Sequence, residues 1–323
     1  MSYPALPVRL ATSALRLSTA RQMALRVSAA RQVGLVLVYH RVGPDGPMPH
    51  EVVPTLSSAL FRQHLEALAH LGDVVPVSQL LEPPRPSQRP RFCVTFDDDH
   101  AGHVQHALPI LQAVGIHATF FLSGRNLHAL PPYWWTFLET SIGSKGLEYT
   151  ARALGLNAQS PADLASALEG SPLAERLQEL LPGSSEPPML RADLRKLVDA
   201  GMTVGFHTLH HVRVSDLSGT DLDQAMTVGR LELADAAGSA VDLMAYPYGR
   251  ANQQAADAAE RAGFRAALAS GGHPVSHRSD PFLLGRWDPG PLPADEFAAA
   301  VTLRLLRSQT PPRPALAGRW PRS

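Results

Sequence analysis

A short apolar run in this chain ends abruptly in three carboxylates. The run, Phe92–Phe96, has the composition of a strand, and Asp97, Asp98 and Asp99 follow it directly. Like charges side by side repel one another, whereas a divalent cation takes one carboxylate as a ligand and leaves its neighbour free to activate water. The ends of buried strands are also where α/β folds build active sites. One interpretation is therefore a metal site with an adjacent base, and the other is a solvated turn or a helix N-cap.

Two histidines follow a second apolar run, Met202–Phe206. His207 and His211 have a spacing that can place two imidazoles on one metal ion. With Asp98 they would form a three-ligand catalytic site that keeps an open position for water. The same ligands would also suit Fe(II) in an oxygenase. His210 lies between the two histidines and is expected to point away from the metal.

A rigid turn follows a third apolar run, Val241–Met244. Its sequence is Ala245-Tyr246-Pro247-Tyr248-Gly249. Proline fixes φ and glycine permits unusual backbone angles, so this segment is expected to form a turn at a strand end. Such a turn can direct backbone N–H groups at a developing oxyanion, and it can equally be a structural turn with two packed tyrosines.

Strand-like runs alternate with helical stretches along most of the chain, which predicts a parallel sheet. The expected strands are Leu35–Tyr39, Phe92–Phe96, Ala118–Leu122, Val204–Phe206, Leu243–Tyr246 and Ala266–Ala269. The expected helices are 57–71, 104–114, 191–200, 221–237 and 253–262. Residues 133–188 interrupt this alternation and predict a helical insertion on the side of the active site.

The three polar clusters, in this order, resemble the motifs of the polysaccharide deacetylase family. This is carbohydrate esterase family 4, which contains the nodulation-type chitooligosaccharide deacetylase homology domain. Thr95–Asp98 matches the T-F-D-D of the first motif, with Asp99 where the family has glycine. His207–His211 matches the second motif in full, and Pro247 and Tyr248 match part of the third.

The resemblance covers roughly residues 33–290 and implies a fold for that segment. We expect an α/β structure, an irregular (β/α) barrel of mostly parallel strands with the helical insertion around 133–188. Residues 1–32 would form a basic N-terminal arm. Residues 291–323 would form a C-terminal helix and a flexible basic tail.

The resemblance also implies roles for the matched residues. Asp97 would be the catalytic base, and the backbone N–H of Tyr248 would stabilise the oxyanion. The ligands of one divalent metal ion, usually zinc, would be Asp98, His207 and His211. Tyr246 and Pro247 would contact the sugar. Apart from the resemblance, Trp134 and Trp135 open the insertion with aromatic rings that could stack on sugar rings. For the two tryptophans, packing in a core or hinge is the alternative.

Two departures from the family pattern concern catalysis. The arginine that normally orients the base is replaced by Ala245, so either another arginine takes this role or hydrogen bonds alone hold the base. The usual late histidine, the general acid, is missing from Leu284–Asp288. His40, at the end of the first strand, is the candidate for that role, with His273 and His277 next. Asp99 would be a partner of a ligand, a helix N-cap or a like-charge neighbour of Asp97.

The expected activity is a metal-dependent hydrolase that removes N- or O-acetyl groups from a saccharide or glycan precursor by cleaving carbon–nitrogen (amide) bonds or esters. A metal hydrolase acting on a non-sugar amide or ester is one alternative, because the catalytic residues do not specify a sugar ring. A catalytically weak, glycan-binding member of the family is the other, favoured by the missing arginine and late histidine.

Composition narrows the classes of partner and compartment. The 29 basic and 29 acidic residues balance, which argues against a nucleic-acid-binding protein. Cys93 is the only cysteine, so no intrachain disulfide exists. No apolar run is long enough to span a bilayer and no secretory signal is apparent, so a cytoplasmic location is expected. The arginine-rich residues 1–32 are expected either to touch an anionic membrane surface peripherally or to form a packed surface helix or a disordered leader.

Overall fold

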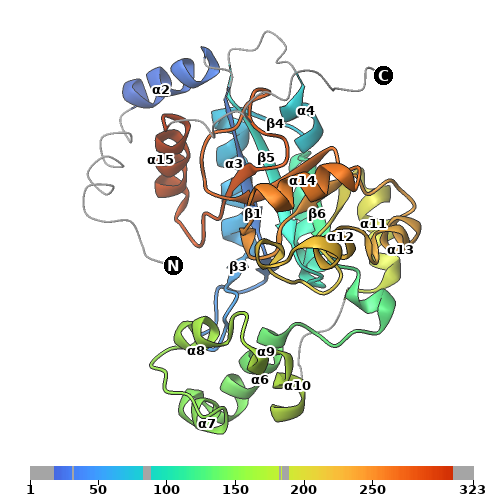
Figure 1. Cartoon of the computed structure of the whole chain (residues 1–323). Coiled ribbons are helices and arrows are strands. Elements are labelled where there is room, and N and C mark those ends of the chain that lie inside the picture. The colour runs from blue at the N-terminus through green and yellow to red at the C-terminus, as the bar shows by residue number, and fades with distance from the viewer. Residues whose placement is uncertain (1–17, 31–32, 83–88, 182, 184–188, 308–323) are drawn as a thin grey trace.

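The computed structural model describes residues 18–30, 33–82, 89–181, 183 and 189–307 of the 323-residue chain. The outer parts of the basic arm and tail, 1–17 and 308–323, lie outside the described residues. The structure consists of a β/α barrel with a helical lobe at one end and a helix near the N-terminus at the other (Figure 1).

In the described segments, seven parallel strands close into the predicted barrel. Around the barrel they are β1 (Gly34–Tyr39), β10 (Leu284–Trp287), β9 (Ala266–Ser270), β8 (Leu243–Ala245), β7 (Thr203–Phe206), β6 (Ala118–Leu122) and β5 (Arg91–Asp97). The barrel closes because β1 pairs with both β10 and β5. Nearly every residue of these strands is buried, which explains why they are continuous apolar runs and do not alternate in polarity.

Three shorter strands lie beside this barrel. β4 (Asp73–Val74) pairs with the first two residues of β5. β2 (Arg41–Gly43) pairs in parallel with β3 (Thr55–Ser57). The register of the barrel places the carboxyl ends of its strands at one rim. Asp97 is opposite Phe121, and Phe206 is opposite both Leu122 and Met244. Residues that follow these strands therefore meet at the same rim.

Helices pack around the barrel and connect its strands. They are α3 (Ser58–Leu71), α4 (Val77–Leu81), the π-helix η1 (His103–Ala107), α5 (Leu108–Val114), α11 (Arg191–Asp199), α12 (Gly219–Thr227), α13 (Arg230–Ala237), α14 (Gln253–Arg261) and α15 (Ala294–Leu305). The single helix expected over 221–237 is broken into α12 and α13. Gly229 separates them with φ of 83°, and a Cβ there would lie 3.1 Å from the Leu209 side chain.

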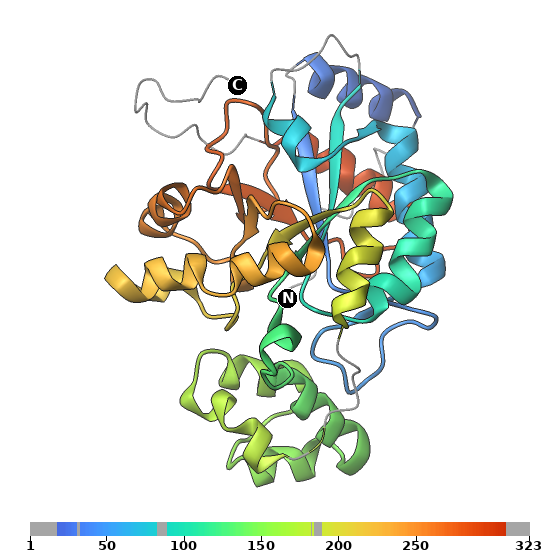
Figure 2. The same cartoon turned by 90° about the vertical axis from the view of Figure 1, so that its right-hand side faces the viewer.

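The insertion forms a small helical lobe with its own apolar core. Its helices are α6 (Trp134–Lys145), α7 (Leu147–Ala153), α8 (Pro161–Leu168), α9 (Pro172–Glu175) and α10 (Leu177–Leu180). Leu138, Leu164 and Leu177 are fully buried at its centre. Figure 2 shows the lobe below the barrel, at the end opposite α2 (Ser18–Ala30).

The described part of the basic arm, α2, packs against α15. Ala24 of α2 and Ala299 of α15 are buried together. Met23 and Val27, on the same helix, are exposed. None of the helices in the described ranges combines the length and the apolar character that crossing a membrane requires.

Candidate active site

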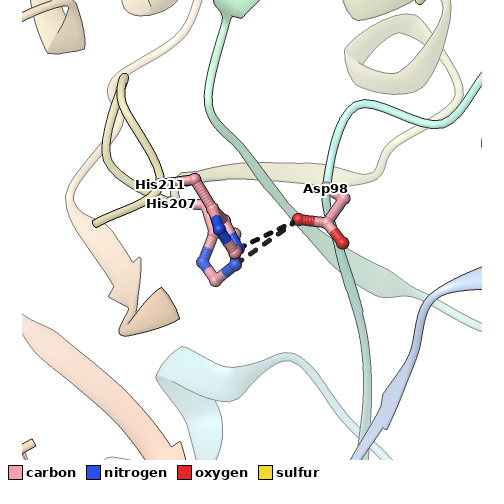
Figure 3. A group of neighbouring side chains, drawn as sticks. All are labelled: Asp98, His207 and His211. Carbon is pink, nitrogen blue, oxygen red and sulfur yellow. Dashed lines mark ion pairs between the residues drawn. The ribbon is translucent and has the colours of Figure 1, made fainter. Parts of the chain in front are cut away.

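Three potential metal ligands meet at the carboxyl rim of the barrel. Asp98 follows β5, and His207 and His211 follow β7. The Oδ1 atom of Asp98 lies 3.7 Å from His207 Nε2 and 3.4 Å from His211 Nε2 (Figure 3). All three ligand atoms lie within 4.8 Å of one another, and all three residues are buried. Tetrahedral ligands about 2.0–2.1 Å from a zinc ion would be about 3.4 Å apart, close to these distances.

The hydrogen bonds of this group also fit a metal ion. Asp98 Oδ1 is buried, and the described residues offer it no hydrogen-bond partner. His207 Nδ1 donates to the carbonyl oxygen of Ala245 at 2.8 Å, which leaves the lone pair of Nε2 facing the site. Burial lowers the pKa of His211 to about 3, so its imidazole is neutral, as a metal ligand must be. These residues therefore fit a divalent metal ion.

The other oxygen of Asp98 faces His100. His100 Nε2 lies 3.6 Å from Asp98 Oδ2, and both side chains are buried. Burial works to raise the pKa of Asp98, but the contact with His100 outweighs it and holds that pKa well below its usual value. Asp98 is therefore ionised. Its Oδ1 faces His207 and His211, and its Oδ2 faces His100.

Asp97 is held by Arg286, which lies far from it in the sequence. Arg286 Nη1 and Nη2 donate to Asp97 Oδ1 and Oδ2 at 2.5 and 2.7 Å. Burial works to raise the pKa of Asp97, but the Arg286 guanidinium and His207 keep it below its usual value. Arg286 thus makes the contact that Ala245 cannot make. The sequence did carry a signal for it, an arginine in the apolar run Leu284–Trp287.

Backbone strain is concentrated at this rim. Five non-glycine residues in the described segments have positive φ, and four of them are Asp98 (71°), Thr208 (54°), His211 (51°) and Tyr248 (58°). Such angles cost of order 1–3 kcal/mol each and persist only where the surrounding structure imposes them. They are typical of functional sites, where they fix the direction of a side chain or an N–H group.

The Pro247–Gly249 turn, η4, places Tyr248 beside His211. The Tyr248 ring centroid is 4.7 Å from that of His211, and the Tyr248 hydroxyl accepts a hydrogen bond from Trp134 Nε1 at 3.2 Å. Gly249, with φ of 64°, lies so close to Ser270 that a Cβ would be 1.7 Å from its Oγ. The turn is therefore fixed both to the barrel and to the insertion.

His40 directly follows β1 at the same rim. Its Nδ1 lies 3.7 Å from Asp288 Oδ2, and its side chain is 29% exposed. The buried His103, in the π-helix η1, donates from Nε2 to the carbonyl oxygen of His40 at 2.8 Å. His277 lies elsewhere: it is two residues from Val275, which exchanges backbone hydrogen bonds with Gly34 at the start of β1.

The remaining predicted contact residues differ in accessibility. Trp134 is partly exposed, whereas Trp135 is buried, stacked on Tyr133, and edge-on to His211 at 5.2 Å. Tyr246 is fully buried and donates its hydroxyl hydrogen to the carbonyl oxygen of Phe282. Pro247 is buried within its turn.

Asp99 anchors the loop that follows β6. Its Oδ1 accepts from the backbone N–H groups of Ser123 (2.9 Å) and Gly124 (3.3 Å), and its Oδ2 accepts from that of Arg125 (3.1 Å). This capping contact lies at the start of the 3-10 helix η2 (Arg125–His128). The N-cap residue of η2 is Gly124, so Asp99 binds the N–H groups at this helix start from a distant part of the sequence and is not itself the N-cap.

The sequence model of the polysaccharide deacetylase family matches residues 85–267, more than half of the chain. The chain therefore belongs to the polysaccharide deacetylase family. No curated protein matches it.

Several solved structures share the fold. The Streptococcus pyogenes deacetylase PplD in complex with acetate has 17% identity and a TM-score of 0.57, over 83% of this chain and 98% of that one. IcaB from Ammonifex degensii has 18% identity and a TM-score of 0.55, over 84% and 97%. BC0361, a polysaccharide deacetylase from Bacillus cereus, has 14% identity and a TM-score of 0.56, over 84% and 69%. At these identities the likeness concerns the fold.

Proposed function

We propose that this protein is a metal-dependent hydrolase that removes N- or O-acetyl groups from a saccharide or glycan precursor. The observation that carries the proposal is the buried group of Asp98, His207 and His211, with Asp97 beside it. Family membership supports the reaction and the class of substrate. Zinc is the metal we propose, because one carboxylate and two imidazoles at these distances suit a tetrahedral ion.

The chain's own residues would divide the reaction between them. When bound, the metal would polarise the acetyl carbonyl and lower the pKa of a water molecule toward about 7. Asp97, ionised and oriented by Arg286, would accept a proton from the attacking water. The N–H of Tyr248 would stabilise the oxyanion. His40, beside Asp288, would donate a proton to the leaving nitrogen.

Arg286 weakens the case for one of the two alternative functions. A catalytically weak, glycan-binding member was favoured by the absence of an arginine at Ala245 and of the late histidine. Because Arg286 contacts both oxygens of Asp97, the first of these reasons no longer holds. A hydrolase of non-sugar amides or esters would use the same catalytic residues, so the choice of substrate must separate it from the proposal.

The test is acetate release from a panel of N-acetylated and O-acetylated saccharides and non-sugar acetyl amides. We expect zinc-loaded protein to release acetate from saccharides and chelated protein to release almost none, with activity restored by added zinc. Release from the non-sugar amides alone would refute the choice of a saccharide. Unchanged release after verified removal of the metal would refute metal dependence.

The proposed role of His40 predicts a difference between two kinds of substrate. An amide needs protonation of its leaving nitrogen, whereas an activated aryl ester leaves without it. His40→Ala should therefore lower amide turnover by roughly 10²-fold or more and affect aryl acetate turnover much less. Steady-state rates on an N-acetylated saccharide and on an aryl acetate would measure the difference.

His70→Ala is the matched control, because His70 is exposed at the end of α3, away from the rim. It should leave both rates unchanged, and both variants should keep full metal content. Equal losses on the two substrates in His40→Ala would assign His40 a structural role and exclude it as the acid.

A further inference from the structure

His100 is a buried histidine to which neither the family motifs quoted above nor the proposed reaction gives a role. Its side chain is 3% exposed, and its Nε2 lies 3.6 Å from Asp98 Oδ2. This is the oxygen that does not face His207 and His211 (Figure 3). A buried imidazole needs a polar partner, because burial without one costs free energy. Asp98 therefore has the two proposed histidine ligands beside one oxygen and His100 beside the other.

Packing fixes the ring of His100 in this place. The rings of His100 and His103 lie edge-on with their centroids 5.6 Å apart, and the Tyr133 ring centroid is 6.5 Å away. His103 is itself held, because its Nε2 donates to the carbonyl oxygen of His40 at 2.8 Å. It begins the π-helix η1, and π-helical turns occur frequently at functional sites. Contacts with neighbouring rings therefore hold Nε2 of His100 toward Asp98.

The second oxygen of Asp98 matters because a carboxylate can bind a metal ion through one oxygen or through both. Asp98 Oδ1 and the Nε2 atoms of His207 and His211 would supply three ligand atoms and leave the fourth position of a tetrahedral ion for water. Binding through Oδ2 as well would occupy space that this water needs. A hydrogen bond from His100 to Oδ2 would engage that oxygen and leave Oδ1 for the ion.

His100 does not belong to the ligand group itself. Among the residues that the structure describes, the group of ligand atoms that all lie within 4.8 Å of one another comes from Asp98, His207 and His211. A ring nitrogen that carries hydrogen toward a carboxylate also has no lone pair to offer a metal ion. The position of His100 suits a partner of a ligand.

We infer that His100 is a positioning residue, which donates a hydrogen bond from Nε2 to Asp98 Oδ2 and so restricts Asp98 to binding the metal ion through Oδ1. The inference rests on the proposed metal-dependent function and adds a residue that sets the geometry of the site without touching the ion. Replacing a partner of this kind typically changes metal affinity by about 10–100-fold. His100 should therefore govern both the affinity for zinc and the coordination of the bound ion.

The experiment compares His100→Gln with His100→Met in the full chain. The two new side chains have the same length, but only glutamine has an N–H group that can replace Nε2 as the donor to Asp98. Competition with a chromogenic chelator would measure the dissociation constant for zinc. We expect roughly 10–100-fold weaker binding in His100→Met and nearly wild-type binding in His100→Gln.

Cobalt(II) in place of zinc gives a second readout, the visible absorption of the bound ion. This absorption weakens when the coordination number rises above four. Cobalt-saturated His100→Met should therefore absorb more weakly per bound ion than the wild type, because Asp98 can then bind through both oxygens. His100→Gln should keep the wild-type spectrum. A role of His100 in packing alone would not separate the two variants in this way.

His106→Met is the control, because His106 also lies in η1 and is partly exposed. It should keep the zinc affinity and the cobalt spectrum of the wild type. Should His100→Met not fold, His100→Asn takes its place, since its shorter amide does not reach Oδ2 and should bind zinc as weakly.

Equal weakening of zinc binding in His100→Gln and in the variant without the donor would overturn the inference. Unchanged affinity in both would overturn it as well, and both results would leave the metal-dependent function intact. A wild-type chain that binds no divalent metal ion would instead refute the proposed function itself, and the inference with it.

Discussion

Replacing His207 with alanine should remove the stoichiometric metal ion and nearly all deacetylation. His207 would supply one of the three proposed ligand atoms, and its Nε2 is directed at the site because Nδ1 donates to the carbonyl oxygen of Ala245. Changing only an outer partner of a metal ligand typically costs about 10–100-fold in metal affinity or activity. Loss of the ligand itself should therefore exceed about 10²-fold. Elemental analysis of the purified variant and its rate of acetate release would measure both effects.

His210→Ala is the matched control for metal content. His210 belongs to the same loop but is exposed and is not one of the three predicted ligands. This variant should bind one metal ion per chain, as the wild type is expected to do. A full metal content in purified His207→Ala would contradict the ligand assignment, whatever its activity.

The parts of this structure that the sequence predicted are those in which a single strand sets the position of a residue. Asp98 and His207 each follow an apolar run, and parallel strands place such residues at one rim. The alternation of strands and helices predicted the parallel sheet, and the family resemblance added the barrel. That the residues after β5 and β7 meet could be expected without knowing how the barrel closes.

Arg286 was missed because its role depends on barrel closure. It is 189 residues from Asp97 in the sequence, and only the pairing of β10 with β1 brings it beside β5. Compared with the family pattern, the segment Leu284–Asp288 stands out for the histidine that it lacks, which does not identify Arg286. A buried strand that contains an arginine does require a charged partner, and this is the signal that would have found it.

Asp99 and the cavity between the helical lobe and the loop after β7 show a second reason why the sequence does not predict the whole site. The role of Asp99 depends on three N–H groups from the loop after β6, which local sequence cannot place around it. The cavity depends on how the helical lobe packs against the loop after β7. Both are consequences of tertiary packing between segments that are far apart in the sequence.

Asp97→Asn should abolish base catalysis and keep the metal ion. The amide has nearly the shape of the carboxylate but cannot accept the water proton, so kcat should fall by roughly 10²–10⁴-fold. Asp97 is not among the three predicted ligands, so elemental analysis should still find one metal ion per chain. Loss of metal together with activity would contradict this division of roles.

The same substitution should destabilise the protein, and a double variant separates that effect from catalysis. Arg286 and Asp97 are 3% and 6% exposed, and a buried charge that loses its partner typically costs about 3–5 kcal/mol. Asp97→Asn should therefore lower the free energy of unfolding, measured in denaturant. Adding Arg286→Met removes the unpaired charge, so the double variant should be less destabilised than the sum of the two single variants. Its turnover should nevertheless stay as low as that of Asp97→Asn, because no base is restored. If turnover recovered with stability, Asp97 would serve to neutralise Arg286, and the proton acceptor would have to be another group at the rim.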